Sequence, residues 1–191
     1  MYTSESLLGC FLELLAPLRP NDVAFAELDE IDHDDHAAHV YQDPERGAIG
    51  MAWLSGRLYG RATQTGTYAD VTTAQALGFL VSAGVFERLG IPARDVDASL
   101  LKDAKKRDVT RTVARFLFDL RGVGSSQPAV DGIAFRSRMG DDFRMWAVFE
   151  RGNEYVSEHI SPDGTSERVT EENVALLQAL ELLDLHWKKE A

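Results

Sequence analysis

The stretch DGIAFRSRMGDDFRMWAVFER, from Asp131 to Arg151, decides the fold because it has the pattern of two strands joined by a turn. Phe135 and Ser137 fall on one face of the first strand, since side chains along a strand alternate with a period of two. Residues 139–142, MGDD, supply the turn. Residues 145–149 are apolar on both faces, which is typical of a central strand covered on both sides. Ser137 therefore continues an inward-facing apolar face, where a hydroxyl needs a hydrogen-bond partner or a ligand.

The composition indicates one cytoplasmic domain. A chain of 191 residues is long enough to bury roughly 70% of its unfolded surface in one core. The net charge of −11 argues against direct nucleic-acid or membrane binding, because phosphate surfaces attract basic patches. Cys10 is the only cysteine, so no internal disulfide can form, and we interpret it as a small buried residue. The apolar run 7–18 is interrupted by Glu13 and is neither a signal peptide nor a membrane span.

Hydrophobic periodicity and turn residues predict an α+β fold, with a small mixed or antiparallel sheet flanked by helices. Ser4 is the predicted N-cap of the first helix, and Gly90 the predicted stop of the central one. The predicted helices are 4–16, 21–31, 73–89, 108–120 and a final one from 170 that carries Val174, Leu177, Leu180 and Leu183. The remaining predicted strands are 57–64 and 68–71, and a hairpin made by 155–160 and 167–169.

Glu13 interrupts the first predicted helix, which is otherwise apolar around most of its circumference. Its neighbours three and four positions away are small or compact, and they leave space beside the carboxylate: Gly9, Cys10, Ala16 and Pro17. A carboxylate beside such a space can receive a ligand. The alternative is a Glu that reaches the surface or pairs with an Arg.

Two other groups of polar residues have simpler explanations. The acidic segment from Asp32 to Gly47 contains three His residues, but their spacing does not converge on one helical face, so we expect a solvated loop without a metal. Arg111 and Arg115 lie one turn apart on a predicted helix, where solvated or i,i+4 contacts are expected. The motifs of P-loop enzymes, Rossmann dehydrogenases and α/β-hydrolases are absent.

Segments far apart in the chain resemble the RES-domain family. YTSESLLGCFLELLAPLRP (2–20) resembles the element that carries the family's Glu, here Glu13. DGIAFRSRMGDDFRMWAVFE (131–150) resembles the family's Ser segment, here with Ser137. RLYGRATQTGTYADVTTAQALGFL (57–80) is similar to the family's middle strands and helix. The resemblance covers almost the whole chain and is strongest at the Ser segment.

RES-domain proteins are typically bacterial toxins of toxin–antitoxin systems, with a fold related to ADP-ribosyltransferases, and they act on NAD. Some degrade NAD by hydrolysis or phosphorolysis, and others transfer ADP-ribose. The resemblance thus implies Glu13 and Ser137 as catalytic residues, NAD as the substrate, no metal, and an antitoxin protein as partner. The family's Arg lies on a strand upstream of the Glu segment, so residues 1–191 are expected to be a single RES-like domain that is N-terminally truncated relative to the family.

The implied chemistry has a physical basis. Cleavage of the nicotinamide–ribose bond builds oxocarbenium-like charge on the ribose, which a desolvated carboxylate such as Glu13 stabilises. Ser137 can orient nicotinamide or ribose by hydrogen bonding. An Arg fork normally holds the pyrophosphate, and alternation points Arg136 and Arg138 away from the Ser137 face.

Three functions remain open at this point. An NAD glycohydrolase, NAD phosphorylase or ADP-ribosyltransferase leads, with little turnover expected because the family Arg has no counterpart. A different NAD-dependent or nucleotide hydrolase is a second enzyme. A degenerate, non-catalytic RES domain that binds a partner protein is the alternative from another class. The sequence also leaves open a homo-oligomer.

Overall fold

The computed structural model describes residues 1–21, 45–103, 105–152 and 157–188. The chain divides into two compact units, which are described separately. Unit 1 comprises Met1–Cys10 and Gly60–Thr165, and unit 2 comprises Phe11–Tyr59 and Ser166–Ala191. The described residues form five helices, a four-stranded mixed sheet and small two-stranded sheets, which confirms the predicted α+β class. No helix among them is long and apolar enough to cross a membrane.

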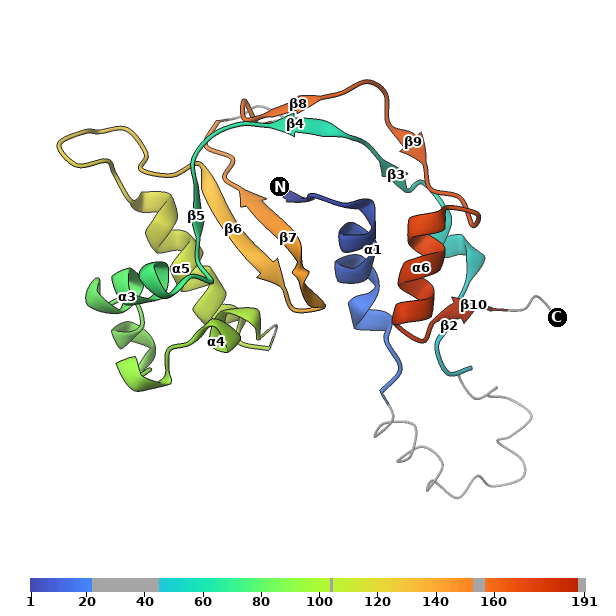
Figure 1. The fold of residues 1–191 in the computed structure, drawn as a ribbon, viewed down its shortest axis with the longest axis horizontal. Coiled ribbons are helices and arrows are strands. Elements are labelled where there is room, and N and C mark those ends of the chain that lie inside the picture. The colour runs from blue at the N-terminus through green and yellow to red at the C-terminus, as the bar shows by residue number, and fades with distance from the viewer. Residues whose placement is uncertain (22–44, 104, 153–156, 189–191) are drawn as a thin grey trace, which may run out of the picture. The chain divides into compact units, whose positions relative to one another are not determined.

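The predicted hairpin forms the centre of the sheet in unit 1 (Figure 1). The strand order is β1 (Tyr2–Ser4), β7 (Gly140–Val148), β6 (Gly132–Ser137) and β5 (Tyr68–Asp70). β5 runs parallel to β6, and the other neighbours are antiparallel. Apolar residues are buried on both faces of β6 and β7, as expected for central strands.

Three helices of unit 1 lie on the same side of this sheet (Figure 1). They are α3 (Ala74–Ser82), α4 (Ala98–Lys102) and α5 (Arg107–Asp119). Their buried residues share one apolar core with the sheet: Val71, Leu80, Val85, Phe86, Leu100, Val109, Val113, Leu117 and Ile133. α5 agrees with its prediction within one residue at each end.

The helix predicted over 73–89 is shorter than its periodicity indicated. The Thr73 hydroxyl caps α3, but the helix ends at Ser82 because Gly84 adopts a left-handed φ of 69°. Separate 3-10 turns follow at Glu87–Leu89 and Ala93–Asp95.

The N-terminal helix also begins later than predicted. Ser4 belongs to β1 and pairs with Met145 of β7, so it cannot cap a helix. α1 (Leu7–Leu15) is capped instead by Ser6, whose hydroxyl accepts a hydrogen bond from the Gly9 N–H at 3.0 Å. A 3-10 turn, Ala16–Leu18, follows α1.

The predicted hairpin of 155–160 and 167–169 does not form, because its two strands pair with different partners. In unit 1, β8 (Ile160–Pro162) pairs antiparallel with β4 (Ala62–Gln64). In unit 2, β9 (Glu167–Arg168) pairs antiparallel with β3 (Leu58–Tyr59). The single strand predicted over 57–64 is therefore two short strands. The backbone groups of β3 and β4 form hydrogen bonds with β9 and β8, so β8 and β9 do not pair with each other.

Unit 2 contains a parallel pair and the last helix. β2 (Ala48–Ile49) pairs with β10 (His186–Trp187), and a 3-10 turn, Met51–Leu54, follows β2. α6 (Val174–Leu182) is capped by Asn173 rather than Thr170. Its buried face consists of Leu176, Ala179 and Leu180, with Leu183 just beyond it. Of the four apolar residues that marked the predicted helix, Leu180 and Leu183 are buried, and Val174 and Leu177 are exposed.

Candidate functional site

Glu13 lies on α1 in the part of that helix that belongs to unit 2. Its side chain is partly exposed and interacts with another residue. The space expected beside it is reduced at Gly9, where an added Cβ would lie 2.5 Å from the Ser4 hydroxyl and 3.3 Å from the Phe143 ring. The lack of a side chain at Gly9 therefore allows α1 to pack closely against Ser4 and Phe143. The ligand-binding role of Glu13 stays a prediction.

Ser137 ends β6 and is only 2% exposed, which agrees with its predicted inward direction. Its hydroxyl accepts a hydrogen bond from the Met139 N–H at 2.9 Å, and it has a further interaction. This bond closes the connection from β6 to β7, so the buried hydroxyl has a structural partner. Ser137 belongs to unit 1 and Glu13 to unit 2. The sequence leads us to predict that both side chains flank one pocket, since each is a polar residue set into an otherwise apolar surface, and this stays a prediction.

Cys10 remains consistent with a packing residue. It is partly buried, and desolvation raises the pKa of its thiol, against hydrogen bonds from Ser4 that lower it. A thiol with a raised pKa stays protonated at neutral pH. Cys10 is therefore not set up as a nucleophile.

A pair of arginines on the sheet of unit 1 was missed by sequence reasoning. Arg136 of β6 is directly opposite Arg144 of β7 in the strand register. Side chains in such positions lie on the same face of the sheet, and like charges there repel each other. The carboxylate of Asp70, on β5, lies 3.6 Å from a terminal nitrogen of Arg144. The Arg144 guanidinium also lies 5.5 Å from the centre of the Trp146 ring.

The backbone of Arg144 is held firmly by the N-terminal segment. Its N–H donates to the Glu5 carboxylate at 3.2 Å, and its carbonyl accepts from the Ser4 hydroxyl and the Glu5 N–H, each at 3.3 Å. Its side-chain Nε is buried and has no hydrogen-bond partner among the residues that the structure describes. A buried, unsatisfied guanidinium N–H is costly and gains from an added acceptor.

The surroundings of Arg136 carry a third cation. Lys102, at the end of α4, forms an ion pair with Asp141 on β7. The pKa of Asp141 is lowered, first by the hydrogen bond and charge of Lys102 and in smaller part by the charge of Arg136. The Asp70 carboxylate is shared, because one of its oxygens accepts from the Thr72 hydroxyl at 2.8 Å. Three cations therefore lie near one another at this end of the sheet, with the carboxylates of Asp70, Asp141 and Glu5 among them.

Most of the His-rich segment lies in 22–44, outside the described residues, as does nearly all of the helix predicted over 21–31. Within the described ranges, no group of three or more His, Cys, Asp or Glu side chains is arranged to hold a metal ion. The ion pair between His186 and Glu45, with Nε2 and Oε1 3.0 Å apart, has no third partner of that kind there.

Comparison with known proteins adds no relative: no family model, no curated protein and no solved structure matches this chain. The resemblance to RES-domain proteins therefore rests on the quoted segments alone. The basic cluster Arg136, Arg144 and Lys102 is an independent observation, made without that resemblance.

Proposed function

We propose that this chain acts on NAD in the manner of RES-domain toxins, on an ADP-ribosyltransferase-like scaffold. The bond between nicotinamide and ribose C1′ breaks, nicotinamide leaves with the bonding electrons, and an acceptor forms a new bond to C1′. Water gives hydrolysis, phosphate gives phosphorolysis, and a protein side chain gives ADP-ribose transfer. Support comes from the three sequence segments and from the opposed arginines Arg136 and Arg144.

The observation that carries the proposal is the opposed pair Arg136 and Arg144. The pyrophosphate of NAD is a dianion with several acceptor oxygens, and guanidinium groups bind such oxygens with charge-assisted hydrogen bonds. The buried Nε of Arg144 has no acceptor among the described residues. A phosphate oxygen would satisfy it and would also reduce the repulsion between the two arginines. In this proposal the pair takes the role of the family Arg, because the register shift between Arg136 and Ser137 interrupts the alternation that would otherwise place these two residues on opposite faces of the sheet.

Glu13 and Ser137 keep the roles that the resemblance implies. Glu13 stabilises the positive charge that develops on the ribose. Ser137 orients nicotinamide or ribose, and through its bond to Met139 it also fixes the turn that precedes Arg144. These roles require both residues to serve one ligand, so replacing either residue should reduce the same rate.

The test is to incubate the purified chain with NAD, with and without inorganic phosphate, and to quantify nicotinamide and the ADP-ribose product. We expect slow nicotinamide release that falls at least about a hundredfold in Glu13→Gln. Arg94→Ala is the control, because Arg94 is exposed and its only ion pair among the described residues is with Asp95. A product that changes with phosphate identifies the acceptor.

Two results would reject the proposal. One is nicotinamide release that is unchanged in Glu13→Gln, which would indicate a contaminating enzyme. The other is the absence of both NAD binding and turnover, which would favour the alternative of a non-catalytic domain that binds a partner protein.

A further inference from the structure

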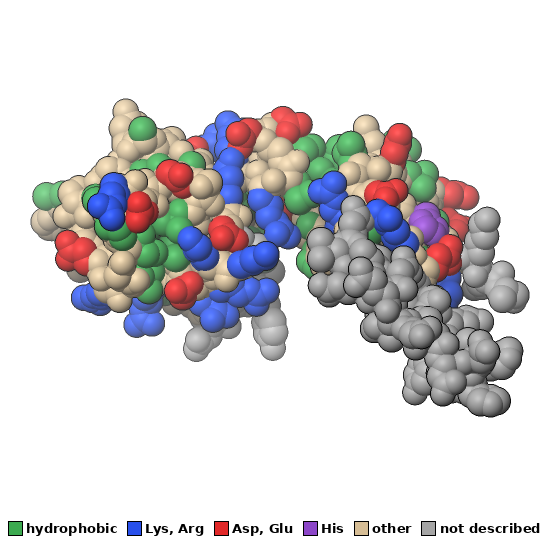
Figure 2. Space-filling view, turned by 90° about the horizontal axis from the view of Figure 1, so that it is seen from below, with side chains coloured by type: hydrophobic (Ala, Val, Ile, Leu, Met, Phe, Trp, Pro, Cys, Tyr) green, Lys and Arg blue, Asp and Glu red, His purple; other side chains and the backbone are tan. Residues whose placement is uncertain are grey.

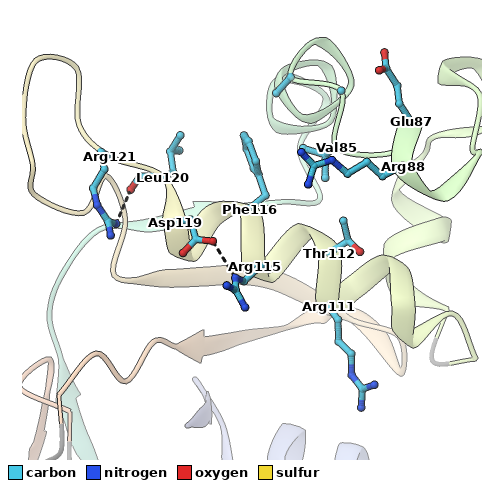
Figure 3. A pocket seen from close by; sticks show the side chains of 12 residues that line it. Val85, Glu87, Arg88, Arg111, Thr112, Arg115, Phe116, Asp119, Leu120 and Arg121 are labelled. Carbon is cyan, nitrogen blue, oxygen red and sulfur yellow. Dashed lines mark hydrogen bonds and ion pairs between the residues drawn. The ribbon is translucent and has the colours of Figure 1, made fainter.

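Unit 1 has a groove whose lining residues include none of the basic cluster Arg136, Arg144 and Lys102. It lies between the turn that follows α3 and the side of α5, and its volume is about 820 Å³ (Figure 3). That is far more than a single small anion needs, since one water takes up about 30 Å³ in the liquid. The lining residues are Ala83, Gly84, Val85, Glu87, Arg88, Arg111, Thr112, Arg115, Phe116, Asp119, Leu120 and Arg121.

Arginines dominate the charged lining. The Nε atom of Arg115 lies 2.9 Å from Oδ2 of Asp119. The Nη1 atom of Arg121 donates a hydrogen bond to the Phe118 carbonyl oxygen at 3.2 Å. Arg88 and Arg111 make no hydrogen bond or ion pair with any residue that the structure describes. The groove therefore offers two cations without an ion-pair partner among the described residues, with one further acidic lining residue, Glu87, in a chain whose net charge is −11. Figure 2 shows Lys and Arg side chains interspersed with Asp and Glu on one face of the molecule.

The same groove has an apolar component. Val85 is buried at its base, and Phe116 and Leu120 are partly buried along α5. The Phe116 ring packs against Phe79, with ring centres 5.9 Å apart, and Phe79 is itself about half exposed. Exposed aromatic surface of this kind, bordered by charge, is characteristic of a protein-binding surface.

We propose that this groove binds an acidic, amphipathic peptide segment of a partner protein. Acidic side chains of the segment would pair with Arg88 and Arg111, and its apolar side chains would cover Phe116 and Leu120, as in the helix-in-groove mode of recognition. Charge complementarity selects this occupant, because a neutral segment would leave the arginines uncompensated and a simple anion would leave the aromatic surface exposed. The inference uses none of the residues assigned to NAD and stands without that function.

The probe is a fluorescein-labelled peptide of about four helical turns, with Leu and Phe at i, i+3, i+4 and i+7 and Glu elsewhere. Binding is followed by fluorescence anisotropy with the full chain. In one matched peptide Lys replaces every Glu, and in another Ser replaces every Leu and Phe. We expect saturable binding of the first peptide, none of the Lys peptide, and at least about tenfold weaker binding of the Ser peptide.

Variants of the chain locate the binding surface. Arg88→Glu with Arg111→Glu should weaken binding at least about tenfold by reversing the charge. Ala83→Trp, at an exposed lining position, should weaken it by filling the groove without changing the charge. Arg61→Glu with Arg94→Glu is the charge-matched control, since both residues are exposed and lie outside the groove. Circular dichroism confirms that each variant is folded.

Four outcomes would overturn the proposal. Equal weakening by the control pair, or equal binding of the Ser peptide, would show only long-range attraction of anions. Preference for a labelled oligonucleotide of similar charge would indicate nucleic acid instead. Self-association in light scattering, lost in the Arg88→Glu, Arg111→Glu variant, would show that a second copy of the chain occupies the groove.

Discussion

Two arginines of unit 1 each lie beside a carboxylate, but their side chains differ in solvent exposure and in hydrogen bonding. Arg115 on α5 is 2.9 Å from Asp119, and its side chain is 81% exposed. Arg144 on β7 is 3.6 Å from Asp70, and its side chain is 40% exposed with a buried Nε that lacks a described partner. The shorter distance belongs to the more solvated pair.

The comparison shows that distance alone does not identify a functional cation. An exposed i,i+4 pair contributes only about 0.3–0.5 kcal/mol to stability, because water screens the charges. Arg144 is next to another cation, Arg136, and has lost part of its hydration. It therefore has more to gain from a bound anion than Arg115 has.

The largest difference is expected when each arginine is removed in turn. Arg144→Ala should weaken NAD binding roughly tenfold to a hundredfold, because a charge-assisted contact contributes about 1.5–3 kcal/mol. Arg115→Ala should leave NAD binding within about twofold. Isothermal titration measures both. Arg144→Lys keeps the charge but not the fork, and an intermediate affinity would support bidentate binding. Equal effects of Arg144→Ala and Arg115→Ala would remove the distinction between the two sites.

A smaller effect should follow from removing the carboxylate of the sheet pair. Asp70→Asn retains an oxygen for the Thr72 hydroxyl but leaves Arg144 without the carboxylate that lies 3.6 Å from its guanidinium. We expect the free energy of unfolding in urea to fall by about 1 kcal/mol. Inorganic diphosphate should restore part of that loss in the variant. An unchanged urea midpoint in the absence of diphosphate would mean that the two arginines do not repel each other.

Removing the exposed ion pair between Arg115 and Asp119 on α5 should change the free energy of unfolding still less. Asp119→Asn should lower the free energy of unfolding by only about 0.3–0.5 kcal/mol, and high salt should abolish the difference from the parent chain. The salt dependence is measured by urea denaturation. A loss above about 1 kcal/mol would show that exposure had been a poor guide to the strength of this pair.

The smallest effect concerns the pKa of Asp141, which Lys102 and Arg136 lower from its ordinary value of 3.8. A lowered pKa stabilises the fold above the ordinary value, and this contribution is lost as the pH falls through the lowered one. Lys102→Ala should bring the pKa back toward 3.8, as followed by the carboxyl carbon shift in NMR. Arg111→Ala should leave it unchanged. A pKa that stays low in Lys102→Ala would assign the shift to Arg136 instead.

The sequence predicted the elements whose residues pack locally. The strand around Phe135 was found from alternation, the strand around Trp146 from a run that is apolar on both faces, and α5 from its apolar face, because burial leaves a pattern in each. Helix ends were less accurate, since Gly84 and Ser6 act through backbone geometry that periodicity does not report. The partners of β3 and β4 lie about a hundred residues away, and no local pattern specifies such pairing.

The basic site escaped prediction for a related reason. A regular hairpin with its turn at 139–142 would pair Arg136 with Met145. The register instead shifts between Arg136 and Ser137, so that Arg136 is opposite Arg144 and Ser137 is opposite Gly140. In the register of the preceding pairs Ser137 would be opposite Phe143, so the irregularity displaces the pairing by three positions along β7. Ser137 was singled out correctly as buried, but its bond to Met139 depends on that same turn.

The pairing of β1 with β7 also has a consequence for synthesis on the ribosome. Ser4 is aligned with Met145, so roughly 140 residues must be translated after β1 before its partner exists, which takes about 7–30 s at 5–20 residues per second. During this interval β1 is an unpaired strand with free backbone donors and acceptors. The backbone contacts that hold Arg144 are then also unmade, so the basic site can be completed only after most of the chain has left the ribosome.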